Sequence, residues 1–362
     1  MKIGLITLHR WFNYGSMLQA YALNRILNEL EGCECELIDY TPPKIDNNRS
    51  YKLYNDLPEY SEERKTYQKE IAERKRAFNN FMELYKCSGI VYRSDEELEE
   101  KPPIYDKYVT GSDQIWNVNM RIASRAYFLA FTESREKYAL STSCGRCKEK
   151  ELREYGEYIK KYKKIYMRET DGAETIGNII GNKLTETMID PTLILSTEKW
   201  NEITSNSRIV KEPYVACYAT LDDELEKMLP LLKEIHMYTN KEIVLFGMIL
   251  PRNEPWIKNL VAVGPLEMIN LIKNADLVFT HSFHGTAFSV NYNIPFLTYN
   301  DELENPRKEG LLGLLGLQDR IVHNVNECKT ALQKDCSFLY ANTILERERN
   351  RAYDIIKECV ND

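Results

Sequence analysis

The residues most suited to chemistry lie between Thr280 and Ser289, where two of the chain's five histidines stand three positions apart. The pattern predicts that a strand ends at Thr280 and that a helix runs over 284–292. The free N–H groups at a helix start lower the pKa of a nearby histidine and favour an anion. We favour an acid/base or anion-binding role for His281 and His284 over a structural pair. A metal-binding pair is the weakest alternative, since no carboxylate or cysteine is placed to complete it.

A second polar turn, Asn13-Tyr14-Gly15-Ser16, separates a predicted strand over 2–8 from a predicted helix over 16–30. Gly15 permits a tight turn, and Ser16 can cap a helix whose N-terminus favours an anion or a sugar hydroxyl. Gln19 is polar within an apolar stretch and can reach the strand ends. Because the turn has neither the GxGxxG nor the Walker pattern, it gives no support to dinucleotide or ATP binding. A capped turn with no further role is the alternative.

A third polar turn, Gly111 to Asn117, follows a predicted strand over 105–110. It places Asp113 and Gln114 at the carboxyl end of that strand, where α/β sheets bind ligands. Carboxylate and amide groups bind sugar hydroxyls, and Trp116 either anchors the turn or stacks on a ring. The alternative without a ligand is a capped turn over a buried tryptophan.

Two arginines are candidates for binding an anionic substrate. Arg168 ends a predicted strand over 164–167 and suits bidentate binding of a carboxylate or phosphate, although spacing alone favours a surface ion pair with Glu169. Arg307 opens a leucine-rich helix, where a cation opposes the helix dipole. The position of Arg307 therefore indicates an external anionic partner.

The elements that must position these residues alternate between short apolar segments and helices, which predicts parallel sheets in an α/β fold. In the first half we expect strands at 2–8, 36–40, 105–110, 137–141 and 164–167, with helices at 16–30, 59–86 and 148–160. In the second half we expect strands at 214–219, 243–246, 260–263, 277–280 and 295–298, with helices at 222–238, 266–274 and 284–292. These elements predict two Rossmann-like, doubly wound domains around a cleft.

The same elements predict the domain boundaries. An N-terminal α/β domain is expected over 1–208, with a helical insertion at about 43–104. A C-terminal α/β domain is expected over 209–338. The terminal segment 339–362 is expected to form a helix that packs back on the first domain.

Composition restricts the class of partner. The chain of 362 residues is 43% hydrophobic and 28% charged, which is typical of a globular protein. Its net charge of −7 disfavours binding to nucleic acid or to an anionic membrane, while a local basic pocket for a small anion is compatible with it. No apolar run is long enough to span a membrane, and the first residues indicate a strand rather than a signal sequence. Nine scattered cysteines favour reduced thiols and a cytoplasmic location, and we expect the CxxC of Cys144 and Cys147 to be coincidental.

Six segments of the chain form an ordered series: Asn13–Ser16 with Leu18–Leu23, Gly111–Asn117, Arg168-Glu169, Asp190–Leu193, Ser282–Ser289, and Arg307 with Leu311-Leu312 and Leu315–Leu317. Each is a weak motif by itself. Together and in this order they resemble the polysaccharide pyruvyl transferase family, over residues 1 to about 320.

The resemblance implies a GT-B-like fold, with phosphoenolpyruvate bound between an acceptor-side N-terminal domain and a donor-side C-terminal domain. It implies a transferase of polysaccharide or exopolysaccharide biosynthesis, which attaches pyruvate to a sugar as a ketal and releases phosphate. His284 corresponds to the family's key histidine, and Arg168 to an arginine that binds the anionic donor. Many members carry an arginine where this chain has Ser282, and Arg307, which one branch of the family also carries, can compensate for it.

We therefore expect His284 to be catalytic as a proton carrier, with Asp113 as a weaker candidate base. The residues expected to bind substrates are Asn13, Tyr14, Gly15, Ser16, Gln19, Gln114, Arg168, Ser282 and Arg307. Phosphoenolpyruvate is expected as donor substrate and a sugar as acceptor, with no metal, no separate cofactor and no nucleic acid. Whether the acceptor is lipid-linked stays open, as does a transient contact with a membrane surface.

Two other functions stay open at this point. A nucleotide-sugar glycosyltransferase of GT-B type would share the two-domain fold. A glycan-binding member with altered or no transfer activity is motivated by Ser282, which stands where many members have the arginine.

Overall fold

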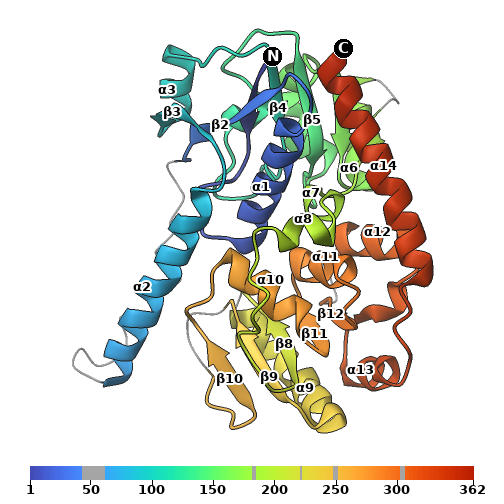
Figure 1. Cartoon of the computed structure of the whole chain (residues 1–362). Coiled ribbons are helices and arrows are strands. Elements are labelled where there is room, and N and C mark those ends of the chain that lie inside the picture. The colour runs from blue at the N-terminus through green and yellow to red at the C-terminus, as the bar shows by residue number, and fades with distance from the viewer. Residues whose placement is uncertain (43–61, 182–184, 221, 248–251, 302–305) are drawn as a thin grey trace. The chain divides into compact units, whose positions relative to one another are not determined.

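The protein forms two compact units in a computed structural model that describes residues 1–42, 62–181, 185–220, 222–247, 252–301 and 306–362. Unit 1 comprises Met1–Asp46, Met82–Leu195 and Leu345–Asp362, and unit 2 comprises Asn47–Phe81 and Ser196–Ile344. Each unit has its own parallel sheet with helices packed on it (Figure 1). The first part of the predicted insertion, 43–61, lies outside the described residues.

The sheet of unit 1 has seven parallel strands in the order β3-β2-β1-β4-β5-β6-β7. The chain winds outward from β1 on one side and then returns to β4 on the other, which is the doubly wound pattern. The strands are β1 (Lys2–Ile6), β2 (Glu34–Tyr40), β3 (Cys87–Tyr92), β4 (Lys107–Thr110), β5 (Lys137–Thr142), β6 (Lys164–Met167) and β7 (Glu186–Thr187). Polar residues that follow β1 and β4 therefore meet where the winding reverses.

Helix α1 (Tyr14–Asn28) is buried along almost its whole length, because it packs between the sheet and α7 (Pro191–Ile194). Asn13 is its N-cap: Asn13 Oδ1 accepts from the N–H of Ser16 at 3.1 Å. The prediction that Ser16 caps this helix is therefore wrong, and Gly15 lies inside the helix. The other helices of unit 1 are α3 (Asp95–Glu100), α4 (Glu149–Leu152), α5 (Gly156–Ile159), α6 (Thr170–Ile180) and the 3-10 turns η3 (Arg125–Phe128) and η4 (Arg153–Tyr155).

An aromatic stack fixes the turn that follows β4. The ring centroids of Trp116 and Phe128 are 5.3 Å apart with the rings nearly parallel, and the ring centroids of Phe128 and Tyr155 are 4.3 Å apart. Trp116 Nε1 donates to the carbonyl of Tyr127 at 3.0 Å. Of the two roles predicted for Trp116, the structure therefore shows the anchor, since the whole side chain is buried.

The sheet of unit 2 repeats the topology with six parallel strands in the order β10-β9-β8-β11-β12-β13. The strands are β8 (Tyr214–Tyr218), β9 (Glu242–Phe246), β10 (Ile257–Leu260), β11 (Leu277–Thr280), β12 (Phe296–Tyr299) and β13 (Ile321–Val322). Its helices are α8 (Thr197–Asn201), α9 (Asp222–Thr239), α10 (Pro265–Lys273), α11 (Phe283–Asn291), α12 (Pro306–Leu314), α13 (Val325–Leu332) and the 3-10 turn η5 (Gln318–Arg320). Here the winding reverses between β8 and β11.

The division into units differs from the predicted boundaries. The segment 196–208 belongs to unit 2, because Asn270 Nδ2 donates to the carbonyls of Ser205 and Ser207 at 2.8 and 2.9 Å. Helix α2 (Glu62–Met82), predicted as part of an N-terminal insertion, also belongs to unit 2 as far as Phe81. Arg74 Nη2 in this helix donates to the carbonyl of Gly247 at 3.1 Å.

The last helix, α14 (Leu339–Asn361), belongs to unit 1 from Leu345 onward. Lys107 Nζ donates to the carbonyl of Cys359 at 2.9 Å, and Lys164 Nζ lies 2.5 Å from Glu358 Oε1. These bonds attach the end of the chain to the β4 and β6 region of unit 1. No helix in the described part of the chain is both long and apolar enough to cross a bilayer.

Candidate functional site

The predicted site residues lie at the two positions where the sheets reverse their winding. In unit 1 we define the unit 1 network, which follows β1, β4 and β6 and consists of Thr7, Ser16, Gln19, Ser112, Asp113, Gln114, Arg168, Asp190 and Thr192. In unit 2 we define the unit 2 turn, Thr280–His284 with Arg307 and Lys308, which lies between the ends of β11 and β12 and the starts of α11 and α12. Each site is described within its own unit.

Gln19 joins β1 to the turn after β4. Its Nε2 donates to Thr7 Oγ1 at 3.0 Å and its Oε1 accepts from the N–H of Ser112 at 3.0 Å. Thr7 Oγ1 in turn donates to the carbonyl of Ser112 at 3.0 Å. Gln19 is fully buried, so it acts as a brace between two loops, which explains a glutamine in an otherwise apolar helix.

Asp113 is the acidic centre of the unit 1 network. Its backbone is left-handed, with φ of 71°, a conformation that aspartate tolerates better than most residues. Asp113 Oδ2 accepts from Ser16 Oγ at 2.5 Å, and Oδ1 accepts from the N–H of Gln114 at 2.8 Å. The predicted residues Ser16, Asp113 and Gln114 therefore lie together.

Arg168 is held inside the unit 1 network, with its side chain only 2% exposed. Its Nη2 lies 2.7 Å from Asp190 Oδ2 and donates to Ser112 Oγ at 2.6 Å, and its Nη1 lies 3.7 Å from Asp113 Oδ1. Asp190 also accepts from the N–H and the hydroxyl of Thr192. Arg168 is therefore not the surface residue that spacing alone favoured, and Glu169, which is also buried, accepts from Ser143 Oγ at 2.5 Å.

Asp190 and Ser112 are the partners of Arg168 that sequence reasoning did not single out as site residues. Asp190 begins the segment Asp190-Pro191-Thr192, which caps α7. Capping alone explains an aspartate before a proline at a helix start. The sequence around Asp190 therefore did not indicate that it is also the counterion of Arg168.

The unit 2 turn is organised by a helix cap. Ser282 is the N-cap of α11, and its Oγ accepts from the N–H of Gly285 at 3.4 Å. Thr280 Oγ1 accepts from the N–H of Ser282 at 3.0 Å and donates to the carbonyl of Tyr218 at 2.7 Å. Gly285 is required here, since a Cβ at this position would lie 2.6 Å from Thr280 Oγ1.

Three side chains at the starts of α11 and α12 lie together around the ring of Phe283. Phe283 packs edge-on against His284 with ring centroids 5.2 Å apart. The guanidinium carbon of Arg307 lies 5.9 Å from the centroid of the Phe283 ring, within the range of a cation–π contact. His284 and Arg307, which were predicted as site residues from segments far apart in the sequence, therefore share one aromatic neighbour.

His281 has a different role from His284. Its Nε2 accepts from the N–H of Thr220 at 3.1 Å, so this nitrogen carries no proton and the ring is neutral. Burial and, to a lesser extent, the charge of Lys308 lower the pKa of His281 to about 4. His281 therefore joins the end of β8 to the end of β11, which is the structural role weighed for one member of the pair.

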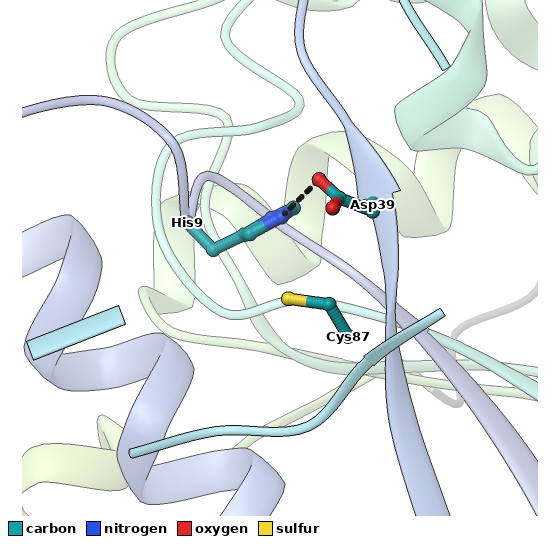
Figure 2. Close-up of side chains that lie close together, drawn as sticks. All are labelled: His9, Asp39 and Cys87. Atoms are coloured by element: carbon teal, nitrogen blue, oxygen red, sulfur yellow. Dashed lines mark hydrogen bonds and ion pairs between the residues drawn. The ribbon is translucent and has the colours of Figure 1, made fainter. Parts of the chain in front are cut away.

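A third cluster, outside both sites, consists of His9, Asp39 and Cys87 (Figure 2). His9 Nε2 lies 3.3 Å from Asp39 Oδ1, and Arg10 donates to both oxygens of the same carboxylate. Although burial acts to raise it, the pKa of Asp39 is lowered to about 2 by the hydrogen bonds from His9 and Arg10. The three side chains lie close enough to hold a metal, but the guanidinium of Arg10 already occupies the carboxylate and its charge opposes a cation.

The two cysteines of the CxxC lie in a buried environment. Cys144 and Cys147 are both buried, and burial raises the pKa of each thiol. Reactive thiols require the opposite shift.

The comparisons with known proteins agree with the sequence motifs. A model of the family described as polysaccharide pyruvyl transferase matches residues 13–301, which is more than half of the chain. No match is found among curated proteins.

Three solved structures share the fold of the whole chain. UDP-GlcNAc 2-epimerase from Methanocaldococcus jannaschii is 14% identical with a TM-score of 0.54, over 98% of this chain and 100% of that one. UDP-GlcNAc 2-epimerase from Neisseria meningitidis, bound to UDP-GlcNAc, is 10% identical with a TM-score of 0.54, over 99% of each chain. MnaA from S. aureus, solved with UDP, is 12% identical with a TM-score of 0.55, over 99% of this chain and 97% of that one. The predicted class, two Rossmann-like α/β halves of GT-B type, is confirmed.

The buried ion pair of Arg168 leads to a prediction about stability. Replacing Arg168 by Met leaves the carboxylates of Asp190 and Asp113 buried without their counterion, and we expect the free energy of unfolding to fall by about 3–5 kcal/mol. Urea denaturation followed by circular dichroism measures the change. Arg153→Met is the matched control, because Arg153 also lies 2.7 Å from a carboxylate, that of Glu149, but is 70% exposed. An equal loss in both variants would contradict the assignment.

His281 leads to a prediction about pH. Because its pKa is about 4 in the folded protein and ordinarily 6.5, the unfolded chain binds a proton first as the pH falls. The free energy of unfolding should therefore decline between pH 6.5 and 4, by about 2–3 kcal/mol from this residue. His281→Gln, whose amide oxygen can still accept from Thr220, should show a shallower decline in urea titrations at each pH. Parallel declines would rule out His281 as the cause.

Proposed function

The chain belongs to the polysaccharide pyruvyl transferase family, and from this premise we propose that it transfers pyruvate from phosphoenolpyruvate to two hydroxyls of a sugar as a ketal, with release of phosphate. The observation that carries the proposal is the placement of His284 and Arg307 against the same ring, Phe283, at the start of α11. This arrangement combines a proton carrier, a fixed positive charge and a helix N-terminus in one unit. An anionic, acid-labile donor requires these three features together.

Donor binding is assigned to unit 2. Phosphoenolpyruvate carries a carboxylate and a phosphate, so it needs several N–H donors and at least one permanent charge. Arg307 supplies the charge, and the N-terminus of α11, capped by Ser282, supplies backbone N–H groups. Many family members have an arginine at the position of Ser282, which carries no charge. In this proposal Arg307 supplies the positive charge instead.

The chemistry moves two protons, one from each sugar hydroxyl. The C3 carbon of the enol gains a proton, which makes C2 electrophilic, and two sugar oxygens bond to C2 while the C2–O bond to phosphate breaks. The two hydroxyl protons account for the balance: one reaches C3 and the other leaves on the phosphate. We assign the transfer to C3 to His284, because an imidazole can both receive and donate a proton near neutral pH.

Acceptor binding is assigned to the unit 1 network. The hydroxyl of Ser16, the carboxylate of Asp113 and the amide of Gln114 lie at the reversal point of a doubly wound sheet, where sugars and nucleotides bind in such folds. Asp113 is the candidate base for a sugar hydroxyl. Arg168 holds Asp113 by an ion pair and Ser112 by a hydrogen bond, so it acts in this proposal as a positioning residue more than as a direct donor contact.

The reaction is proposed to take place in the cytoplasm, on a polysaccharide or its lipid-linked precursor. All nine cysteines have free thiols, which suits a reducing compartment. The acidic net charge of −7 disfavours strong attraction to an anionic membrane. A lipid-linked acceptor would therefore be bound through its sugar.

The proposal is tested by phosphate release from phosphoenolpyruvate with a panel of sugars that carry free diols. We expect release with at least one sugar, and we expect His284→Ala to lower kcat by about 100-fold or more, since a proton carrier contributes at least that much. His236→Gln, a histidine on α9, is the matched control with unchanged kcat. Calorimetry should detect binding of phosphoenolpyruvate but not of UDP-GlcNAc. Binding of UDP-GlcNAc alone would favour the glycosyltransferase alternative and overturn the proposal.

Arg307 should affect donor binding rather than the chemical step. Replacing it by Met removes the permanent charge and keeps an apolar contact with Phe283, so we expect KM for phosphoenolpyruvate to rise about tenfold or more with kcat changed less. Steady-state phosphate release measures both constants. A fall in kcat with KM unchanged would assign Arg307 to the chemical step instead.

A further inference from the structure

Lys308 is the buried cation of the unit 2 turn. It is the third residue of α12, yet it is only 1% exposed. Its Nζ donates to the carbonyl of His281 at 3.0 Å and to the carbonyl of Tyr299 at 2.5 Å. These carbonyls lie at the carboxyl ends of β11 and β12, which are neighbouring strands. One ammonium group therefore joins two strand ends and bonds the residue that directly precedes Ser282.

The charge of Lys308 is balanced only weakly by its surroundings. Among the described residues, no carboxylate lies within 4.0 Å of Nζ, and both of its hydrogen-bond acceptors are neutral carbonyls. The described charged groups that act on it are the carboxyl groups of Glu224 on α9, Asp301 after β12 and Glu309 on α12, and the like charge of Arg307. A buried ammonium without a close counterion is costly, and the start of a helix adds to this cost.

The protonation state of Lys308 is therefore sensitive to a neighbouring anion. Burial and, to a lesser extent, the charge of Arg307 lower the pKa of Lys308 to about 7, against the opposing effect of the carboxyl groups of Glu224, Asp301 and Glu309. His281, the titratable residue on the other side, stays neutral at this pH. An anion bound at the start of α11 would favour the charged ammonium.

We propose that Lys308 is a positioning residue of the donor site, which holds the His281–His284 turn and couples its own protonation to the binding of the anionic donor. This inference rests on the proposed function, since it assigns the donor to unit 2. The carbonyls of His281 and Tyr299 orient the ammonium, and the bound anion stabilises its charge. Donor binding then takes up a proton from solvent whenever Lys308 is neutral in the free protein.

The sign of the pH dependence follows from this coupling. Below pH 7 Lys308 is charged before the donor binds, so affinity does not depend on its titration. Above pH 7 Lys308 is mostly neutral in the free protein, so donor binding requires a proton to be taken up from solvent. This uptake becomes less favourable as the proton concentration falls. The Kd for phosphoenolpyruvate should therefore rise with pH, by up to about tenfold per pH unit. If Lys308 only stabilised the fold, its titration would not make the Kd for phosphoenolpyruvate depend on pH.

The test measures the Kd for phosphoenolpyruvate by calorimetry between pH 6.5 and 8.5, in two buffers of different ionisation enthalpy. We expect the wild type to take up a proton above pH 7 and to lose affinity as the pH rises. Lys308→Met should bind more weakly at pH 7 and show a flatter slope, while the permanently charged Lys308→Arg should lack the proton uptake. Lys329→Met, an exposed lysine on α13, is the control and should match the wild type.

The outcomes separate the two proposals. The ligand's own titration is common to all variants, so the difference between the wild type and Lys308→Met isolates the lysine. Equal slopes and equal proton uptake in these two proteins would overturn the role of Lys308 and leave the proposed function intact. Absence of phosphoenolpyruvate binding to the wild type at every pH would overturn both. If the Met variant fails to fold, the difference in proton uptake between the wild type and the permanently charged Lys308→Arg isolates the lysine in the same way.

Discussion

Parallel pairing of every strand places the carboxyl ends of all strands at one edge of each sheet. Crossover helices begin at the same edge, so their unsatisfied N–H groups and the last carbonyls of the strands meet there. These backbone groups must find partners when they are buried. In both units the polar residues of the candidate sites satisfy them, and they lie where the winding reverses, between β1 and β4 and between β8 and β11. The sites are a consequence of this constraint.

The two units meet the constraint with opposite electrostatics. In unit 1 a buried arginine, Arg168, is paired with two aspartates, Asp190 and Asp113, so the network leaves no positive charge unbalanced. In unit 2 a buried lysine, Lys308, faces neutral carbonyls and has Arg307 as its neighbour. The first arrangement suits a neutral, hydroxyl-rich ligand, whereas the second leaves positive charge for an anion. The assignment of acceptor to unit 1 and donor to unit 2 follows this difference.

Local sequence patterns were sufficient to predict the bounds of the strands and helices whose buried residues follow a regular pattern. The strand 277–280 and the helices that start near 222, 265 and 283 were expected within one or two residues. Strand β3 was missed because it is an exposed edge strand without regular alternation, and β10 was expected three residues too late. The cap of α1 was assigned to Ser16 because serine is a good cap, but Asn13 takes that role and releases Ser16 to bond Asp113.

The sequence by itself determined the family, the α/β class and most of the polar residues at the strand ends, because these depend on local spacing and residue type. The tertiary structure decided which of them meet. Arg168 turned from a surface candidate into a buried counterion of Asp190, a pairing over a separation that no local pattern encodes. Lys308 follows Arg307 in the sequence, and nothing in this pair of basic residues indicates burial. The packing of α12 on the ends of β11 and β12 buries the charge of Lys308. Burial and long-range contact set the energy of a charge, and both are properties of the folded chain.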